Sequence, residues 1–453
     1  METISQRIAK FTSKLRWDDL PSHVKEKSKV TLLHNLGMAM AGIPLATTAQ
    51  SYANSLKEQG VNASARLLFN GLSATPDTAA LANAALMHAR AQDDVYFQGL
   101  THSGSVMTPA ALAIAESLNA SGQDVLVALV VGSEACAAIC EGYGVESAKR
   151  GFRPTGVFGV FASTVAVARL LGLDADRTAH AISIAASCGS GVAQPWVASS
   201  QEWQFQIGMA SRNGILAARL AAAGVTGASD ALEGTAGFYR AFAGSTDGSE
   251  KVATELGRVW RSLDVTYKPF PVCAILQAPV TRAIELAVKN DLKVNEISSV
   301  RLYLNPTEAS IPGTDSEGPY HATGATLMSA QFCLSVALSK RTVQGSDLQR
   351  YNDPELLSLI KRTKVIVDAS LGTRSFKLQI DQRHGSSITH VENNIGESFN
   401  WTAEETIANL KRISSELPFD KVEFSQFVDT IMNAENVSAK TLVDVCLQQR
   451  RVA

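Results

Sequence analysis

Apolar residues recur at helical spacing through residues 1–254. Near the start they fall on one face, for example at Ile4, Ile8, Phe11 and Leu15, a spacing that is typical of amphipathic helices. Runs rich in Ala and Leu then predict helices over residues 79–91, 109–119, 124–143, 174–187 and 208–223. This part of the chain contains no convincing strand-like alternation. We therefore expect a large all-α region whose Ala- and Gly-rich helices pack closely in several layers.

The pattern changes after Asp264. An extended segment with two prolines, residues 267–271, is followed by a predicted helix over residues 274–288. Alternating or β-branched runs then predict strands over residues 298–305, 364–367, 375–380 and 387–391, with a helix over residues 325–339 among them. From Trp401 onward the pattern is helical again. The prediction is a mainly α protein: a large helical domain built from both chain ends (residues 1–265 and 397–453) with a smaller α+β lid domain inserted at residues 266–396.

The stretch from Gly151 to Leu173 begins as a turn and continues as a helix. Pro154 disfavours helix in the residue before it, so residues 152–155 should run extended. A helix over residues 157–171 would be apolar on almost every face, which predicts a buried helix. Its free backbone N–H groups, its dipole and the Arg153 guanidinium would converge on one small volume, a natural site for a carboxylate. The alternative is a buried helix with a tight Gly-Pro turn and no ligand.

A second unusual stretch follows the predicted helix over residues 79–91. It holds Asp93 and Asp94 and then a loop with Tyr96, Thr101, His102, Ser103 and Ser105. Such a density of polar and titratable groups beside an Ala-rich helix is typical of a functional site. Helix capping and loop hydrogen bonds by Asp and Ser are the alternative explanation.

Composition narrows the class of protein. The chain has 453 residues, of which 45% are hydrophobic and 19% charged, which excludes a disordered chain and predicts two domains. A formal net charge of −2 provides no excess of positive charge for binding nucleic acid or an anionic membrane. Any anion site must therefore be local.

The cysteines and the apolar runs indicate in which cellular compartment the protein is expected. The six cysteines are scattered through apolar segments, which predicts reduced thiols in a cytoplasmic protein. Cys136 and Cys140 are spaced at i, i+4, but without a second ligand pair they predict no metal site. The apolar runs are interrupted before they reach the roughly 20 residues that a bilayer requires, and the N-terminus has no apolar region of the kind found in secretory signals. We therefore expect no membrane span.

Six motifs, the first of them in two consecutive parts, occur in register along nearly the whole chain. They read NAALMHARAQDD, THSGSVMTPAALA, GFRPTGVFGVFAS, FQIGMASRNGILAA, LEGTAGFYRAF, YKPFPVC and AQFCLSVAL. In this order the chain resembles the MmgE/PrpD family, which includes 2-methylcitrate dehydratase, cis-aconitate decarboxylase and iminodisuccinate epimerase. The resemblance implies a large all-α domain with a smaller lid domain, in a homodimer without a metal or organic cofactor.

The resemblance also implies site residues. Asp93, His102 and Lys268 match family motifs and are the expected catalytic residues. The expected substrate-binding residues are Thr101, Arg153, Thr155, Gln206, Tyr267 and Ser335. The chain departs from the family pattern in three places. Arg153 stands where the decarboxylases and dehydratases have a histidine, Trp203 and Gln206 where they have a basic residue and a histidine, and Ser335-Val336 where they have a proline-tyrosine pair.

The family's reactions share the formation of a carbanion beside a carboxylate. Arg153 and Lys268 together would stabilise an enediolate-like state, and His102 would act as general acid or base, with Asp93 orienting it or carrying the proton. We therefore expect a lyase that removes water or carbon dioxide from a small-molecule di- or tricarboxylate. An epimerase of an amino-dicarboxylate is an alternative, as is a catalytically silent binding protein. Each residue also has a structural alternative. His102 would be a loop histidine, Lys268 a solvated lysine, Asp93 a helix cap and Arg153 part of a surface ion pair.

Overall fold

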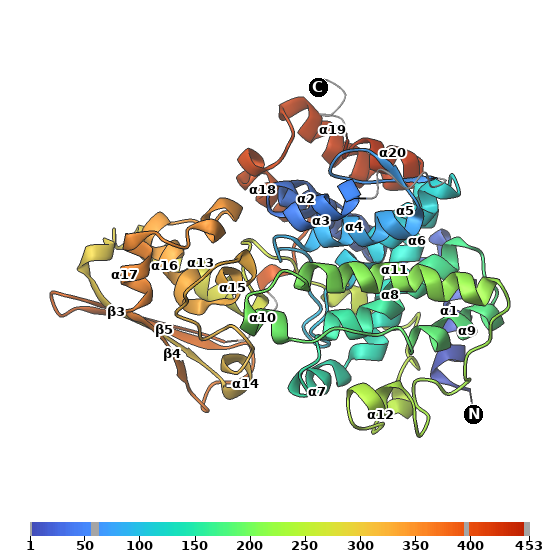
Figure 1. Cartoon of the computed structure of the whole chain (residues 1–453), viewed down its shortest axis with the longest axis horizontal. Coiled ribbons are helices and arrows are strands. Elements are labelled where there is room, and N and C mark those ends of the chain that lie inside the picture. The colour runs from blue at the N-terminus through green and yellow to red at the C-terminus, as the bar shows by residue number, and fades with distance from the viewer. Residues whose placement is uncertain (1, 56–62, 394–397, 448–453) are drawn as a thin grey trace.

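Helix α8 (Pro154–Leu170) lies at the centre of the larger of two bodies (Figure 1). The computed structural model describes residues 2–55, 63–393 and 398–447. In it α8 is buried along nearly its whole length and packs against α5 (Ser103–Ser117), α6 (Gly122–Cys140) and α11 (Trp203–Ala222). Small residues allow this close approach, because a Cβ on Gly132 would lie only 2.6 Å from the carbonyl oxygen of Ala162. The prediction of a buried central helix is confirmed.

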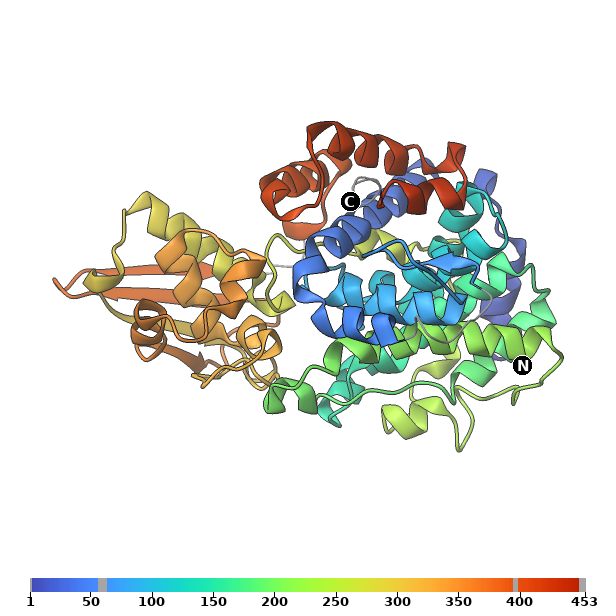
Figure 2. The ribbon, with the colours of Figure 1, turned by 45° about the horizontal axis from the view of Figure 1, so that its top comes forward.

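Both ends of the chain contribute to this larger body, as the blue and red segments show in Figures 1 and 2. The returning helices α18 (Ala403–Arg412) and α19 (Lys421–Met432) pack against α2 (Ser22–Gly42). The other elements of this body are α1 (Ile4–Lys14), α3 (Thr47–Ser55), β1 (Ala65–Arg66), β2 (Ser73–Ala74), α4 (Pro76–His88), α7 (Tyr143–Lys149), α9 (Ala175–Ala185), α10 (Gln194–Ala198), α12 (Phe238–Phe242) and α20 (Ala439–Asp444). The mainly α architecture predicted from periodicity is therefore observed.

The smaller body is built on a four-stranded sheet with the order β4-β3-β5-β6. Strands β3 (Ile297–Leu304) and β4 (Thr363–Val367) are parallel, whereas β5 (Phe376–Gln382) and β6 (Ser387–Glu392) pair antiparallel. Val300, Leu302 and Leu304 alternate on the buried face of β3. The helices of this body are α13 (Gln277–Lys289), α14 (Pro306–Ala309), α15 (Thr323–Met328), α16 (Ala330–Lys340) and α17 (Pro354–Ile360). Of these, α13 and α16 pack against each other and against the sheet.

Two connecting segments join the bodies and are bonded to each other. The Tyr267 backbone N–H donates to the Phe399 carbonyl oxygen at 2.9 Å. The Lys27 ammonium donates to the Val265 carbonyl and to the Asn400 side chain, each at 2.5 Å. The segment that carries Lys268 is therefore held against the helical body. The proposed boundary at residues 396 and 397 lies outside the described residues, and the domain limits remain a prediction.

Helix boundaries differ from the predictions most clearly at α5 and in the helix predicted over residues 325–339. Helix α5 begins at Ser103 and not at Pro109, which lies inside it. It begins earlier because the Asp94 carboxylate accepts from the Gly104 N–H at 3.0 Å and so caps the helix from nine residues before its first residue. The helix predicted over residues 325–339 is interrupted at Ser329, whose hydroxyl accepts from the Phe332 N–H and starts α16.

Helix α6 is long and apolar enough, by length and composition, to cross a membrane. In the protein, 89% of its most apolar window is buried against other helices. The core helices of globular proteins have the same composition, so this helix is weak evidence for a membrane span.

Candidate functional site

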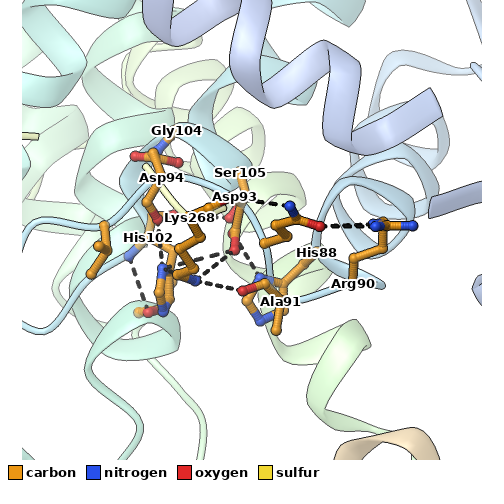
Figure 3. A network of polar contacts seen from close by, with 12 residues as sticks. His88, Arg90, Ala91, Asp93, Asp94, His102, Gly104, Ser105 and Lys268 are labelled. Carbon is orange, nitrogen blue, oxygen red and sulfur yellow. Dashed lines mark hydrogen bonds and ion pairs between the residues drawn. The ribbon is translucent and has the colours of Figure 1, made fainter. Parts of the chain in front are cut away.

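Six titratable side chains from four chain segments meet at the junction of α4, α5, α8 and the first connecting segment. All of them except Arg153 are labelled in Figure 3. We call them the site cluster: His88, Asp93, Asp94, His102, Arg153 and Lys268. All except His102 are buried, and the His102 side chain is 18% exposed. The predicted catalytic residues Asp93, His102 and Lys268 thus lie together, although their catalytic roles remain predictions.

The loop after α4 is held in place by Gln92. Its side-chain amide donates to the carbonyl oxygens of Lys268 at 3.1 Å and Pro269 at 2.7 Å. Its side-chain oxygen accepts from the Arg90 guanidinium at 2.9 and 3.1 Å. Arg90 in turn pairs with Glu416 at 2.8 Å. These contacts fasten the loop to the Lys268 segment, so Asp93 and Lys268 face each other at a defined distance.

Asp93 is the anionic centre of the site cluster. Its carboxylate lies 2.7 Å from His88 Nδ1 and 3.2 Å from Lys268 Nζ. Burial alone would raise the pKa of Asp93, but the His88 and Lys268 contacts hold the pKa well below its ordinary value. Asp93 is therefore a fixed negative charge, and it caps no helix.

His88 connects Asp93 to Arg153. The Arg153 Nη2 lies 2.6 Å from His88 Nε2. Since a guanidinium only donates, His88 Nε2 must accept, and the proton of the neutral imidazole resides on Nδ1 and points at Asp93. Burial lowers the pKa of His88 to about 4, in agreement with a neutral ring. The sequence analysis missed His88 because it falls at the end of a helix and not in a polar loop.

His102 occupies the N-cap position of α5. Its Nδ1 lies 2.6 Å from the Asp94 carbonyl oxygen and 3.4 Å from Lys268 Nζ. Since a carbonyl oxygen only accepts, the shorter contact assigns the proton to Nδ1. Its backbone N–H donates to the Thr155 hydroxyl at 3.2 Å. Nε2 has no hydrogen-bond partner among the described residues. Burial and the Lys268 charge hold the pKa of His102 well below its ordinary value. The ring is therefore neutral and offers the free lone pair of Nε2.

Lys268 and Arg153 are the two cations of the site cluster. Lys268 Nζ donates to the Ala91 carbonyl oxygen at 2.6 Å as well as to Asp93. Arg153 donates to the Trp203 carbonyl and to the Gln206 side-chain oxygen, and its guanidinium lies 4.9 Å from the Trp196 ring centroid. Burial lowers the pKa of Arg153 to about 9. All these direct partners of Arg153 are neutral, so no carboxylate of the described residues is in contact with its charge.

Three predicted binding residues lie outside the site cluster. The Thr101 hydroxyl faces Cys140 Sγ at 3.7 Å. The Tyr267 hydroxyl bonds to the Thr31 hydroxyl at 2.8 Å, behind Lys268. Ser335 is buried in α16, which packs within the smaller body. Of the six predicted binding residues, Arg153 belongs to the cluster, and Thr155 and Gln206 contact its members.

Acid is expected to destabilise the fold between about pH 6.5 and pH 4. His34 and His88 have pKa values lowered by burial to about 4. In this pH range both histidines are therefore protonated in the unfolded chain but neutral in the folded chain. Burial raises the pKa of Asp94 to about 6, so at Asp94 the folded chain binds one proton more readily than the unfolded chain. This contribution has the opposite sign to that of the histidines. Urea unfolding at about pH 7 and about pH 4.5 should show the loss of stability.

His34→Gln provides the matched variant for this experiment. It retains a donor for the Gln92 carbonyl, which His34 Nε2 contacts at 2.8 Å, but it has no proton to gain. The number of protons taken up on unfolding between these two pH values should therefore be lower by about one than in the wild-type protein. An unchanged pH dependence in this variant would contradict the assignment of a neutral buried His34.

Two family models match most of the chain. The MmgE/PrpD N-terminal domain matches residues 6–251 and the MmgE/PrpD C-terminal domain matches residues 270–414. A relative from Aspergillus terreus named cis-aconitate decarboxylase is 26% identical over 423 residues, covering 87% of this chain and 85% of the relative. Proteins of the same name from Homo sapiens and Mus musculus are 28% and 24% identical, covering 60% and 81% of this chain and 57% and 76% of their own lengths.

Proposed function

Because the chain belongs to the MmgE/PrpD family, we propose that it is a lyase that acts on a small unsaturated di- or tricarboxylate, with decarboxylation as its reaction. The observation that carries the proposal is the site cluster, which holds two buried cations and a histidine whose Nε2 has no hydrogen-bond partner among the described residues. The names of the relatives support the same class of reaction.

Decarboxylation moves one electron pair. The C–C bond to a carboxylate breaks, carbon dioxide leaves, and the electron pair passes through the neighbouring double bond to a second carboxylate as an enediolate. A proton then adds to carbon and replaces the lost group. Arg153 and Lys268 would stabilise the negative charge as it develops, because both are already oriented by neighbouring hydrogen bonds.

His102 is the proposed proton carrier. In the free protein its pKa is depressed by burial and by Lys268. Substrate carboxylates in contact with the ring would favour its charged form, so His102 would gain a proton on binding and deliver it to carbon. Asp93 and His88 would hold Lys268 and Arg153 at their positions through the contacts described above.

The smaller body would act as a lid over this site. It meets the walls of the site at two glycines: a Cβ on Gly313 would lie 3.1 Å from the Trp196 carbonyl oxygen, and a Cβ on Gly324 would lie 2.7 Å from Trp203 Nε1. Excluding water there would strengthen the electrostatic contacts of the two cations.

Epimerisation is the second candidate function, and one observation favours it. The free Nε2 of the neutral His102 can remove an α-proton without any prior protonation. An amino-dicarboxylate would then exchange its α-hydrogen and keep its carbon skeleton.

Proton NMR in deuterated water, with a panel of di- and tricarboxylates, distinguishes these functions. A decarboxylase incorporates deuterium into a product that has lost one carboxylate, and an epimerase incorporates deuterium without loss of carbon. A dehydratase would form a new alkene signal. If no compound in the panel changes, the proposal of an enzyme is wrong and a binding protein remains.

Thr155→Val is expected to lower kcat about tenfold with little change in KM. The variant removes the hydroxyl that accepts from the His102 backbone N–H, so the imidazole would lose its orientation while the cations stay in place. Thr155→Ser keeps the hydroxyl and should retain most of the activity. Equal activity of the Val and Ser variants would show that this contact does not position His102.

A further inference from the structure

We propose that the substrate is a dicarboxylate with an uncharged third arm, and that Trp196 and Trp203 select against a third carboxylate. This inference rests on the proposed function, because it concerns the same site. The observations behind it are the distribution of charge in the site cluster and the chemistry of the wall beside Arg153.

Most positive charges in and next to the site cluster are already neutralised by carboxylates of the protein. Lys268 already pairs with Asp93 at 3.2 Å, and Arg90, the next cation along the loop, pairs with Glu416 at 2.8 Å. Arg153 is therefore the one cluster cation that has no carboxylate in contact within the described part of the chain. A dicarboxylate is balanced by Arg153 and a protonated His102, whereas a tricarboxylate leaves one buried negative charge without a partner.

The wall on the Arg153 side carries no charge. The rings of Trp196 and Trp203 lie 5.0 Å apart, and the Trp203 ring lies 5.2 Å from the His88 ring. Gln206 is the third residue of this wall, and its side-chain amide donates to the Val192 carbonyl at 3.0 Å. A ligand arm directed at this wall meets indole carbon atoms, which favours an alkyl or alkenyl group over a carboxylate.

The smaller body adds a further apolar side chain next to this wall. Met328 and the Trp196 carbonyl both lie close to Gly313, at 3.0 and 3.1 Å from where its Cβ would be. Trp203 Nε1 faces Gly324 in the same way. The residues of the smaller body that these contacts place at the wall, Gly313, Gly324 and Met328, are small or apolar.

The test compares two ligands that differ in one group. Ethylsuccinate is tricarballylate with one carboxylate replaced by a methyl group, so calorimetric titration of both measures the preference directly. Ethylsuccinate should bind the wild-type protein at least about tenfold more tightly. Equal or tighter binding of tricarballylate would overturn the inference.

Trp203→Lys tests the residue itself. A lysine beside Arg153 supplies the missing charge and should shift the ratio of the two dissociation constants about tenfold toward tricarballylate. Trp196→Lys makes the same test at a half-buried position, in case the variant at the buried Trp203 does not fold. Val422→Lys, at a position 64% exposed on α19, adds the same charge elsewhere and should leave the ratio unchanged. A ratio that does not move in either tryptophan variant contradicts the inference.

The two proposals fail separately. If ethylsuccinate binds preferentially but no di- or tricarboxylate reacts, the proposed lyase activity is wrong and the ligand preference stands. If tricarboxylates react faster than their methyl analogues in the wild-type protein, the lyase stands and the inferred substrate class is wrong.

Discussion

Lys268→Met is expected to lower kcat by about three orders of magnitude on a confirmed substrate. Methionine keeps the length of the side chain but removes the ammonium that contacts Asp93 at 3.2 Å and the Ala91 carbonyl at 2.6 Å. Without it, one of the two charges that would stabilise the enediolate is lost. The buried Asp93 is also left with one partner fewer, so the variant should lose about 3 kcal/mol of stability.

Because the variant is less stable, kcat must be measured on protein shown to be folded by circular dichroism. Lys364→Met is the matched control, since Lys364 is half exposed and pairs with Glu317 on the surface of the smaller body. It should keep full activity. Full turnover of folded Lys268→Met would show that this lysine has no part in the chemistry.

His102→Asn is expected to lower kcat by about 10²- to 10⁴-fold. Asparagine can still donate to the Asp94 carbonyl, which His102 Nδ1 contacts at 2.6 Å, so the local fold should persist. It cannot carry a proton at neutral pH, and the residual activity should therefore lose the pH dependence that the histidine provides.

The exposed His384, which contacts the Gln382 side chain at 2.7 Å, provides the control. His384→Asn should leave both kcat and the pH profile as they are. If His102→Asn kept the wild-type pH profile, another group would be the proton carrier, and the neutral ring with a free Nε2 would have no catalytic meaning.

The strands and the central helix could be predicted because their patterns are local. Strand β3 alternates buried residues at Val300, Leu302 and Leu304, and α8 is apolar on almost every face. The start of α5 could not be predicted in this way. It depends on the Asp94 carboxylate, which reaches Gly104 from outside the helix, so the polar residues before Pro109 looked like a loop.

The same distinction applies to the site. Asp93, His102 and Lys268 were found through the family resemblance, and the structure brings them together. Tyr267 was expected to bind substrate next to Lys268, but adjacent side chains of an extended segment point to opposite sides. Tyr267 accordingly contacts Thr31.

His88 was missed for a related reason. It ends α4 five residues before Asp93, inside a motif that was noted in the sequence, but its helical position gave no sign of a polar role. Only the fold brings Arg153 within 2.6 Å of its ring. A histidine at the end of a buried Ala-rich helix, followed closely by two aspartates, is the local signal that could have indicated it.

A crystal structure of the protein with ethylsuccinate bound tests the central claim most directly, namely that Arg153, Lys268 and His102 share one carboxylate site. We predict one ligand carboxylate within hydrogen-bond distance of Arg153, the other within reach of Lys268 and His102 Nε2, and the ethyl group against Trp196 and Trp203. A ligand bound with its carboxylates away from all three of these side chains would contradict it.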